Sequence, residues 1–335
     1  MPGIVTVQVV DPSAPHSEPF VEAGSMQQFA LEATYPLLRS ATMRTSISTA
    51  FPLLFALATL ATLAAPGGRG VSRAESPPAF LGGSAAPVPS GGSSNEDLAK
   101  KTQNPVADLI SVPFQNNFDF GVGPENRMVW DMNIQPVIPF RLNENWNLIT
   151  RTILPVLHVP PLAPGVDGAS GIGDLNPTFF FSPTTPGKFV WGVGPTMTFP
   201  TASDRLLGQG NWSAGPAAVG LLMSGPWVVG AIANQQWSFA GWGDRATNKF
   251  LVQPFVNYNF PGGWYLASSP IITGDFSASS GNHWVLPLGA GAGKVLRIGA
   301  LPMNLSLTAY DNVVSPDGGA DWQLRFTFSF LFPKG

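Results

Sequence analysis

The sequence contains no cysteine and few charged residues. The absence of cysteine from all 335 residues excludes a disulfide framework, a zinc site built on thiolates and a cysteine nucleophile. Charged residues make up 11% of the chain, against roughly a quarter in ordinary soluble proteins. Lys and Arg together number 17 against 20 Asp and Glu and form no dense cluster. The chain therefore lacks the basic surface that nucleic-acid binding requires, and we expect no nucleic-acid partner.

Glycine, proline and apolar residues are abundant instead. The chain has 37 Gly and 34 Pro, yet 44% of it is hydrophobic and 11% is aromatic. A low-complexity disordered chain would not carry so much apolar side chain. Most of this apolar mass must therefore be removed from water.

The longest apolar run covers residues 50–65, which is shorter than the roughly twenty residues that a spanning helix needs. Arg44 precedes the run and small residues follow it, as in a secretory signal peptide. We expect residues 43–74 to be that signal peptide, with Met43 as the true start and cleavage after Ala74 or Ala65. Residues 1–42 are then a non-native upstream extension, because their acidic character does not suit the front of a signal peptide; a genuine extra N-terminal region is the alternative.

Residues 75–97 are rich in Pro, Gly and Ser and too poor in apolar residues to fold. We expect a disordered linker there, so that the chain has a disordered N-terminal extension. Residues 98–335 contain no second linker, no charged block and no long 3.6-residue periodicity. They form one domain, which we expect to be all-β.

Strict alternation of apolar and polar residues dominates this domain. In residues 322–332, Trp, Leu and Phe alternate with Gln, Arg, Thr and Ser up to the last pair, which is the pattern of a strand with one apolar face. The apolar face is more aromatic than a small soluble core requires. The pattern recurs and predicts about twelve strands. We place them at 109–121, 127–141, 146–158, 172–183, 189–200, 211–223, 227–240, 248–260, 264–276, 283–296, 301–314 and 321–332.

The connections between these strands alternate between tight turns and longer loops. Residues 143–145, 224–226 and 261–263 are tight turns, whereas residues 164–171 and 201–210 are longer loops. Short turns at one rim and long loops at the other are typical of outer-membrane barrels. The sequence therefore predicts a transmembrane antiparallel up-and-down β-barrel in a bacterial outer membrane, surrounded by its lipids. A soluble β-sandwich or jelly roll is the alternative. Five prolines inside predicted strands (Pro136, Pro139, Pro155, Pro177 and Pro254) are an objection to a continuous barrel wall.

Tryptophans and polar residues indicate which strand parts face lipid and which face the interior. Indole rings prefer the membrane–water interface, and we assign two girdles to tryptophans near strand starts: Trp146, Trp191, Trp227 and Trp264 at one rim, and Trp212, Trp284 and Trp322 at the other. Residues on the polar faces are expected to line the lumen, either as groups along a solute path or as a packed polar network. They are Asn147, Arg151, Asn234, Gln236, Gln253, Asn257, Asn259, Gln323 and Arg325.

Several segments resemble a known family. Residues 103–117 (QNPVADLISVPFQNN), 133–139 (NIQPVIP), 146–152 (WNLITRT), 171–177 (GIGDLNP) and 192–195 (GVGP) are similar to bacterial outer-membrane proteins associated with the phenol meta-pathway and described as transporters. The resemblance covers most of residues 98–335. It implies an outer-membrane barrel with a role in uptake of small, often aromatic or hydrophobic compounds, and it carries no catalytic motif. Residues 1–42 and the long linker depart from the family.

Three kinds of chemistry are considered and set aside. Residues 289–294 (GAGAGK) superficially resemble a phosphate loop, but Leu288 and Val295 break the motif, so a Gly-rich strand is expected. Asp317, Asp321 and Asp174 with Asn176 offer oxygens to calcium, but turn chemistry explains them better. We expect no cofactor and no metal. A lipase needs a Ser activated by a His, and neither His158 nor His283 has a Ser two residues away on its own strand.

The sequence therefore predicts a channel or transporter-like barrel, not an enzyme, for passive passage of small, hydrophobic or aromatic solutes. A non-conducting structural or binding barrel is the first alternative, and an outer-membrane lipase is the second. We also expect the aromatic C-terminal strand to be recognised by the barrel-assembly machinery. The solute, the oligomeric state and a plug formed by residues 98–108 are left open.

Overall fold

The computed structural model describes residues 94–333 apart from residues 186, 244–245 and 280. The expected upstream extension, signal peptide and all but the end of the linker lie outside the described residues. In the described part, one α-helix, α3 (Asn95–Thr102), precedes a continuous antiparallel sheet. None of the helices in this part is long and apolar enough to cross a membrane.

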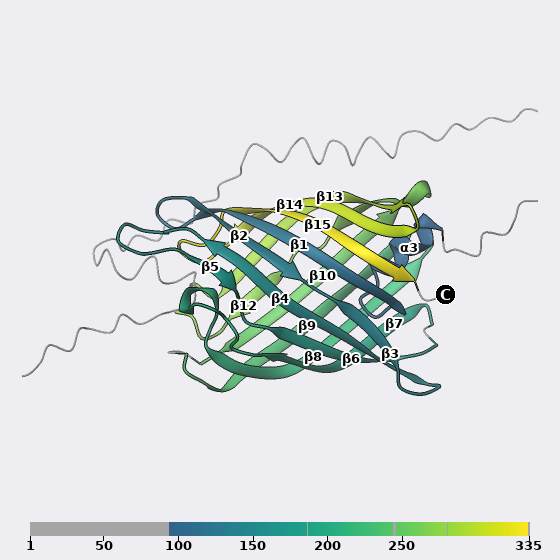
Figure 1. Cartoon of the computed structure of the whole chain (residues 1–335), viewed down its shortest axis with the longest axis horizontal. Helices are drawn as coiled ribbons and strands as arrows, with labels where there is room; N and C mark the ends of the chain where they lie inside the picture. The colour runs from purple at the N-terminus through teal and green to yellow at the C-terminus, as the bar shows by residue number, and fades with distance from the viewer. Residues whose placement is uncertain (1–93, 186, 244–245, 280, 334–335) are drawn as a thin grey trace, which may run out of the picture. The chain divides into compact units, whose positions relative to one another are not determined.

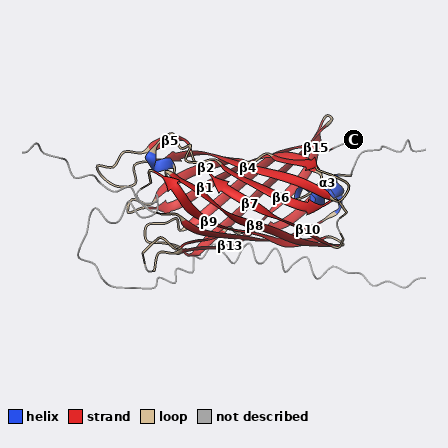
Figure 2. Ribbon diagram, turned by 90° about the horizontal axis from the view of Figure 1, so that it is seen from below, coloured by secondary structure: helices blue, strands red, loops and turns tan. Residues whose placement is uncertain are grey.

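The sheet closes into a barrel of twelve strands, as the sequence predicts (Figures 1 and 2). Closure is made by β1 and β15, which pair from Leu109↔Pro333 to Phe120↔Trp322. Three of the expected strands are each divided in two by a short break, which gives fifteen strand segments. The segments are β1 (Leu109–Val122), β2 (Arg127–Ile134), β3 (Val137–Arg141), β4 (Trp146–Val159), β5 (Ala169–Ile172), β6 (Asn176–Pro183), β7 (Phe189–Thr198), β8 (Asn211–Ser224), β9 (Trp227–Gly241), β10 (Asn248–Asn259), β11 (Trp264–Ser268), β12 (Ile272–Asp275), β13 (Trp284–Ile298), β14 (Leu301–Val314) and β15 (Trp322–Pro333).

The breaks explain how the barrel accommodates proline, which cannot donate a backbone hydrogen bond to a neighbouring strand. Pro254 on β10 faces residues 269–271, the break between β11 and β12. Pro155 on β4 faces residues 173–175, the break between β5 and β6. Pro136 lies in the break between β2 and β3. Three of the five prolines thus lie in or opposite an interruption of the ladder. Pro139 and Pro177 lie inside paired segments, opposite Ile149 and Thr152, so the breaks answer the objection only in part.

The two ends of the barrel differ. Connections 142–145, 184–188, 225–226, 260–263 and 299–300 are short and lie at one end, called here the turn end. Connections 160–168, 199–210, 242–247, 276–283 and 315–321 lie at the other, called here the loop end. Both α3 and the last residues of β15 lie at the turn end (Figure 1). This is the expected arrangement for an even number of strands that starts and finishes on one side.

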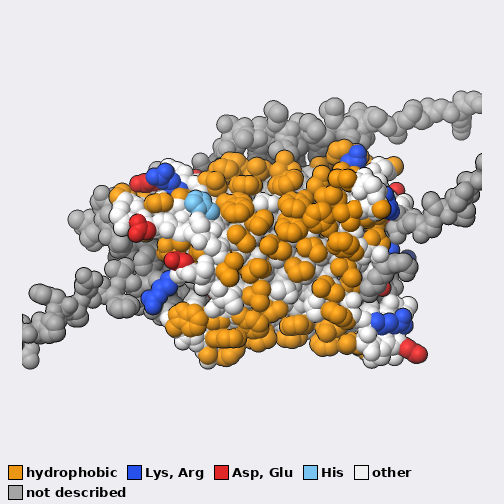
Figure 3. Space-filling model, viewed as in Figure 1, with side chains coloured by type: hydrophobic (Ala, Val, Ile, Leu, Met, Phe, Trp, Pro, Cys, Tyr) orange, Lys and Arg blue, Asp and Glu red, His pale blue; other side chains and the backbone are white. Residues whose placement is uncertain are grey.

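Apolar side chains lie on the outer surface of the barrel and many polar side chains lie inside it, which is the reverse of the arrangement in a soluble protein. On β15, Phe326 and Phe332 are 38% and 45% exposed, whereas Arg325 and Ser329, on the alternate positions, are 6% and 2% exposed. On the face seen in Figure 3, a broad band of apolar side chains covers the outer wall between two more polar ends. Period-2 alternation sends one face of each strand outward and the other into the barrel interior.

The seven tryptophans assigned to girdles lie near the strand ends, with four at the turn end and three at the loop end. Trp146 and Trp191 at the turn end contact each other edge to face, with ring centroids 5.9 Å apart. At the loop end, Trp322 stacks on Phe120 with centroids 4.1 Å apart. Six of the seven are among the exposed large hydrophobic residues. Their positions therefore mark two aromatic belts at the limits of the apolar band.

Candidate functional site: the barrel interior

The segment that precedes β1 crosses the interior at the turn end. Leu98 and Ala99 of α3 are buried against Tyr265, Val295 and Leu331, which point inward from β11, β13 and β15. Both residues are at most 1% exposed. The helix starts with Glu96 and Asp97 and ends with Lys100 and Lys101, a charge order that the helix dipole favours. The segment thus packs against one side of the interior through its apolar face.

The same segment also contacts β10, the neighbour of β11, and the part of the interior formed by β4 and β6. Gln103 and Asn259 of β10 form a reciprocal amide pair, in which each side chain donates to the other at 2.8 and 2.9 Å. Val106 is 6% exposed and packs in an apolar cluster with Ile149 and Phe180. Residues 95–107, called here the plug segment, therefore contact inward-facing residues of β4, β6, β10, β11, β13 and β15 at the turn end.

Arg325 is the centre of a polar cluster on the β14–β15–β1–β2 wall. Its Nε donates to Asn117 Oδ1 at 3.1 Å, and its two terminal nitrogens donate to Ser269 O at 2.9 Å and Gln323 Oε1 at 2.8 Å. The guanidinium carbon lies 4.8 Å from the centre of the Tyr310 ring. The buried guanidinium of Arg325 therefore joins the backbone at Ser269, in the break between β11 and β12, to polar side chains on β1 and β15.

Two carboxylates complete the Arg325 cluster. Asp119 Oδ1 accepts from Gln323 at 2.8 Å. Asp131 Oδ2 accepts from Asn117 at 3.1 Å and from Asn133 at 2.7 Å. The other carboxylate oxygen of Asp131 is buried and has no hydrogen-bond donor among the described residues. The cluster is a packed network, so its charged groups are not freely exposed to a solute in this conformation.

The nine residues predicted to line the lumen all lie on inward-facing positions, and six of them form side-chain hydrogen bonds. Asn257, Asn259 and Arg325 are buried. Arg151 donates to Gln135 at 2.8 Å, Gln236 accepts from Thr198 at 2.7 Å, and Gln253 donates to Ser269 at 2.8 Å. Asn147, Asn234 and Gln323 are partly buried. Most of these side chains are therefore bonded to other residues of the interior, and their role along a solute path stays a prediction.

Sequence reasoning missed two features of the interior. Asp119 and Asp131 alternate in phase with Asn117 and Asn133, so the period-2 pattern contained the signal for them. The second feature is an apolar inner wall on β4 and β6–β10, which the simple division into apolar outside and polar inside did not predict. Its buried members include Ile149, Phe180, Val190, Val219, Leu221, Val228, Ile232 and Phe255.

The two motifs that were set aside in the sequence have structural roles. Residues 289–294 lie within β13, as expected for a Gly-rich strand. Asp174 accepts from the backbone nitrogens of Ala202 and Gln209 at 3.2 and 2.7 Å, so it holds the 199–210 loop. Within residues 94–333, gaps aside, no group of three His, Cys, Asp or Glu side chains could hold a metal ion.

His158 contacts a serine on the neighbouring strand. His158 has no Ser two residues away on its own strand, but the structure places Ser170 of β5 directly across from it. The His158 Nδ1 to Ser170 Oγ distance is 2.7 Å. The contact arises between strands, where spacing along one strand gives no indication of it. Both residues are exposed on the outer wall.

An apolar groove of about 760 Å³ also lies along β7–β10. Most of its lining points outward, including Val193, Pro195, Pro216 and Phe250. Pro195 and Pro216 face each other across β7 and β8, so neither can donate to the ladder there. The groove is therefore a feature of the outer wall, at a point where two facing residues lack a backbone donor.

No protein-family model matches the chain, and no curated protein matches its sequence. Solved structures do resemble it. The COG4313 outer membrane channel from Pseudomonas putida F1 is 15% identical, with a TM-score of 0.51 over 67% of this chain and 94% of that one. This chain shares its barrel fold. Outer membrane phospholipase A from Escherichia coli and LpxR from Salmonella typhimurium are 10% and 9% identical, with TM-scores of 0.36 and 0.35, over 68% and 66% of this chain and 98% and 100% of theirs. At these identities the likeness concerns the fold alone.

Proposed function

We propose that the protein is a channel of the bacterial outer membrane that lets small apolar or aromatic solutes pass down their gradient, and that the plug segment closes it in this conformation. The observation that carries the proposal is the mixed lining of the interior. Apolar side chains point inward from β4 and β6–β10, and a polar cluster points inward from β14, β15, β1 and β2. A solute with an apolar body and a small polar group finds a favourable surface for each part.

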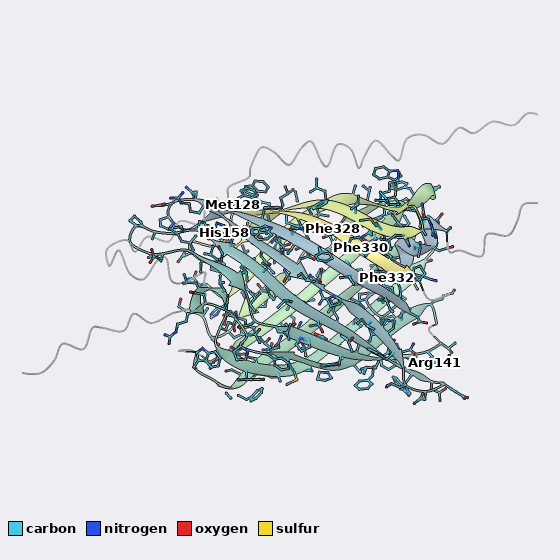
Figure 4. All side chains as sticks on the ribbon, in the orientation of Figure 1. Met128, Arg141, His158, Phe328, Phe330 and Phe332 are labelled. Carbon is cyan, nitrogen blue, oxygen red and sulfur yellow. The ribbon has the colours of Figure 1, made fainter. Side chains whose placement is uncertain are left out.

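The location in an outer membrane is supported by the exposed apolar band and its two aromatic belts. The barrel fold shared with an outer-membrane channel agrees with it. The sequence resemblance to proteins of the phenol meta-pathway supports an aromatic solute. The outward-facing aromatic residues of β15, among them Phe328, Phe330 and Phe332 (Figure 4), support recognition of this last strand by the barrel-assembly machinery.

A planar-bilayer recording of the purified full-length protein tests the proposal. We expect discrete conductance steps that are rare in the wild type and frequent when the plug segment is destabilised. A non-conducting structural barrel would remain silent in both forms, although heat-modifiable migration on a gel shows that each is folded. Silence in both forms would therefore contradict the proposal.

A further inference from the structure

His158 and Ser170 form a hydroxyl–imidazole pair on the outer wall of the barrel. The 2.7 Å separation of His158 Nδ1 and Ser170 Oγ is hydrogen-bond distance for a Ser hydroxyl and a base that can accept its proton. Both side chains are exposed, so an incoming molecule can reach them. Within the described part of the chain, no hydrogen bond to His158 Nε2 is recorded, and the pair is a dyad without a third residue.

The backbone pairing of β4 and β5 holds the two side chains together. Ile172 accepts from Ser203 N at 3.0 Å and its own nitrogen donates to Ser203 Oγ at 3.1 Å, so the polar groups of Ile172 point away from β4. Ser170 lies two residues earlier and has the same orientation. His158 and Ser170 are therefore a non-hydrogen-bonded cross-strand pair, in which side chains approach each other most closely.

The same geometry leaves a backbone donor beside the Ser hydroxyl. The N–H of Ser170 points to the edge of β5 that faces away from β4. β5 pairs only with β4, and among the described residues no acceptor is recorded for this N–H. A backbone N–H next to a nucleophile is the type of group that stabilises the negative charge on a carbonyl oxygen under attack.

The pair is located where an ester group of a membrane lipid would lie. His158 is next to the last residue of β4, at the loop end (Figure 4), and a histidine is visible at the border of the apolar band (Figure 3). One step toward the centre of the band, Val156 pairs with Ile172, which is 41% exposed. On the other side of β4, His158 faces Trp130. Apolar surface on one side of the pair and polar loops on the other suit an amphiphile whose chain lies along the barrel.

We propose that this pair hydrolyses carboxylic esters of long-chain acyl groups held in the surrounding lipid layer. Ser170 Oγ attacks the ester carbonyl carbon while His158 Nδ1 takes the hydroxyl proton. The C–O bond to the alcohol breaks, the alcohol leaves with that proton, and Ser170 carries the acyl group. Water then attacks the acyl-Ser170 while His158 takes its proton, and the products are the carboxylic acid, the alcohol and free Ser170. This activity is separate from solute passage, because the pair faces away from the barrel interior.

An active-site probe and an ester substrate test the proposal on the full-length protein in detergent micelles. The probe is a long-chain alkyl fluorophosphonate, with the modified residue located by peptide mass spectrometry, and the substrate is p-nitrophenyl decanoate. The variants are Ser170→Ala and His158→Gln. Ser224→Ala is the matched control, since Ser224 is an exposed Ser at the turn-end limit of β8. Heat-modifiable migration establishes that each variant is folded.

We expect an adduct on Ser170 in the wild type and in Ser224→Ala. Labelling should be absent in Ser170→Ala and about 100-fold slower in His158→Gln, since general-base assistance contributes at least about that factor. Ester hydrolysis should follow the same order, whereas single-channel conductance should be unchanged in Ser170→Ala. Absence of an adduct on Ser170, an adduct on another Ser only, or full hydrolysis by folded Ser170→Ala would each overturn the proposal.

Discussion

Replacing Leu98 with Ala should release the plug segment and open the barrel. Leu98 is fully buried and is the largest apolar side chain that α3 places against Tyr265, Val295 and Leu331. Truncating a buried Leu to Ala costs about 2–5 kcal/mol in folded proteins. If about 3 kcal/mol of this cost falls on docking of the segment, its docking equilibrium changes by about 100-fold.

Single-channel recording in planar bilayers measures this effect as the fraction of time spent conducting. We expect that fraction to rise strongly in Leu98→Ala, with larger current steps than in the wild type. Lys101→Ala is the matched control, because Lys101 lies on the same helix but is exposed, and it should behave like the wild type. Equal open fractions and equal step sizes in Leu98→Ala and the wild type would refute the plugging role.

The reciprocal amide pair gives an independent check on the same segment. Gln103→Ala removes the two hydrogen bonds of the pair, and Asn259→Ala removes these two and a third, to Pro226 O. Each bond has a net value of about 1 kcal/mol, and each variant also leaves a polar partner unsatisfied. The double variant should therefore open the channel by less than the sum of the two single effects. Strict additivity in this cycle would show that the two side chains do not act as a pair.

Three further predictions concern the walls of the barrel. Arg151→Ala or Arg325→Ala should each shift the reversal potential in a salt gradient toward cations, because each removes a positive charge from the interior; unchanged potentials in both would place these groups off the conduction path. Phe328→Lys should destabilise the barrel folded in lipid vesicles by about 2–4 kcal/mol, as for a charge near the middle of the outer apolar band, whereas Phe328→Leu should have a small effect. Equal urea midpoints of unfolding for the two variants would contradict the outward orientation of this residue. Gly215→Val should weaken the pairing of β8 with β9, because a Cβ there would collide with a carbonyl oxygen of the neighbouring strand; the temperature at which the folded band on the gel disappears should fall. Gly187→Val, in open space, should leave that temperature unchanged. A fall in Gly187→Val but not in Gly215→Val would refute the close approach of the two strands.

The barrel itself could be predicted because each strand carries its own period-2 signal. The alternation in residues 322–332 determines which face is apolar without any knowledge of the neighbouring strands. The prolines also indicated that some strands would be irregular. The sequence could not show which residues lie opposite each proline, because the position of Pro254 opposite the 269–271 break depends on the register between two strands. Local pattern thus determines strands, and long-range pairing determines where they break.

The interior was less predictable for the same reason. The reciprocal pair of Gln103 and Asn259 joins residues that are 156 positions apart, and α3 has too few residues for a clear periodic signal. The contact of His158 with Ser170 requires the register of β4 and β5, and the sequence pattern started that strand at residue 172, after Ser170. Contacts between elements depend on geometry that one sequence does not contain.

The alternation of lipid-facing and interior-facing residues on β15 is the central claim, and single-cysteine variants test it directly. Since the chain has no native cysteine, a fluorophore attached in turn at residues 324–330 reports one position at a time in lipid vesicles. Fluorescence should be quenched by brominated lipid at Leu324, Phe326, Phe328 and Phe330, and much less at Arg325, Thr327 and Ser329. Quenching that shows no two-residue period, or the reverse period, would contradict the inside-out barrel.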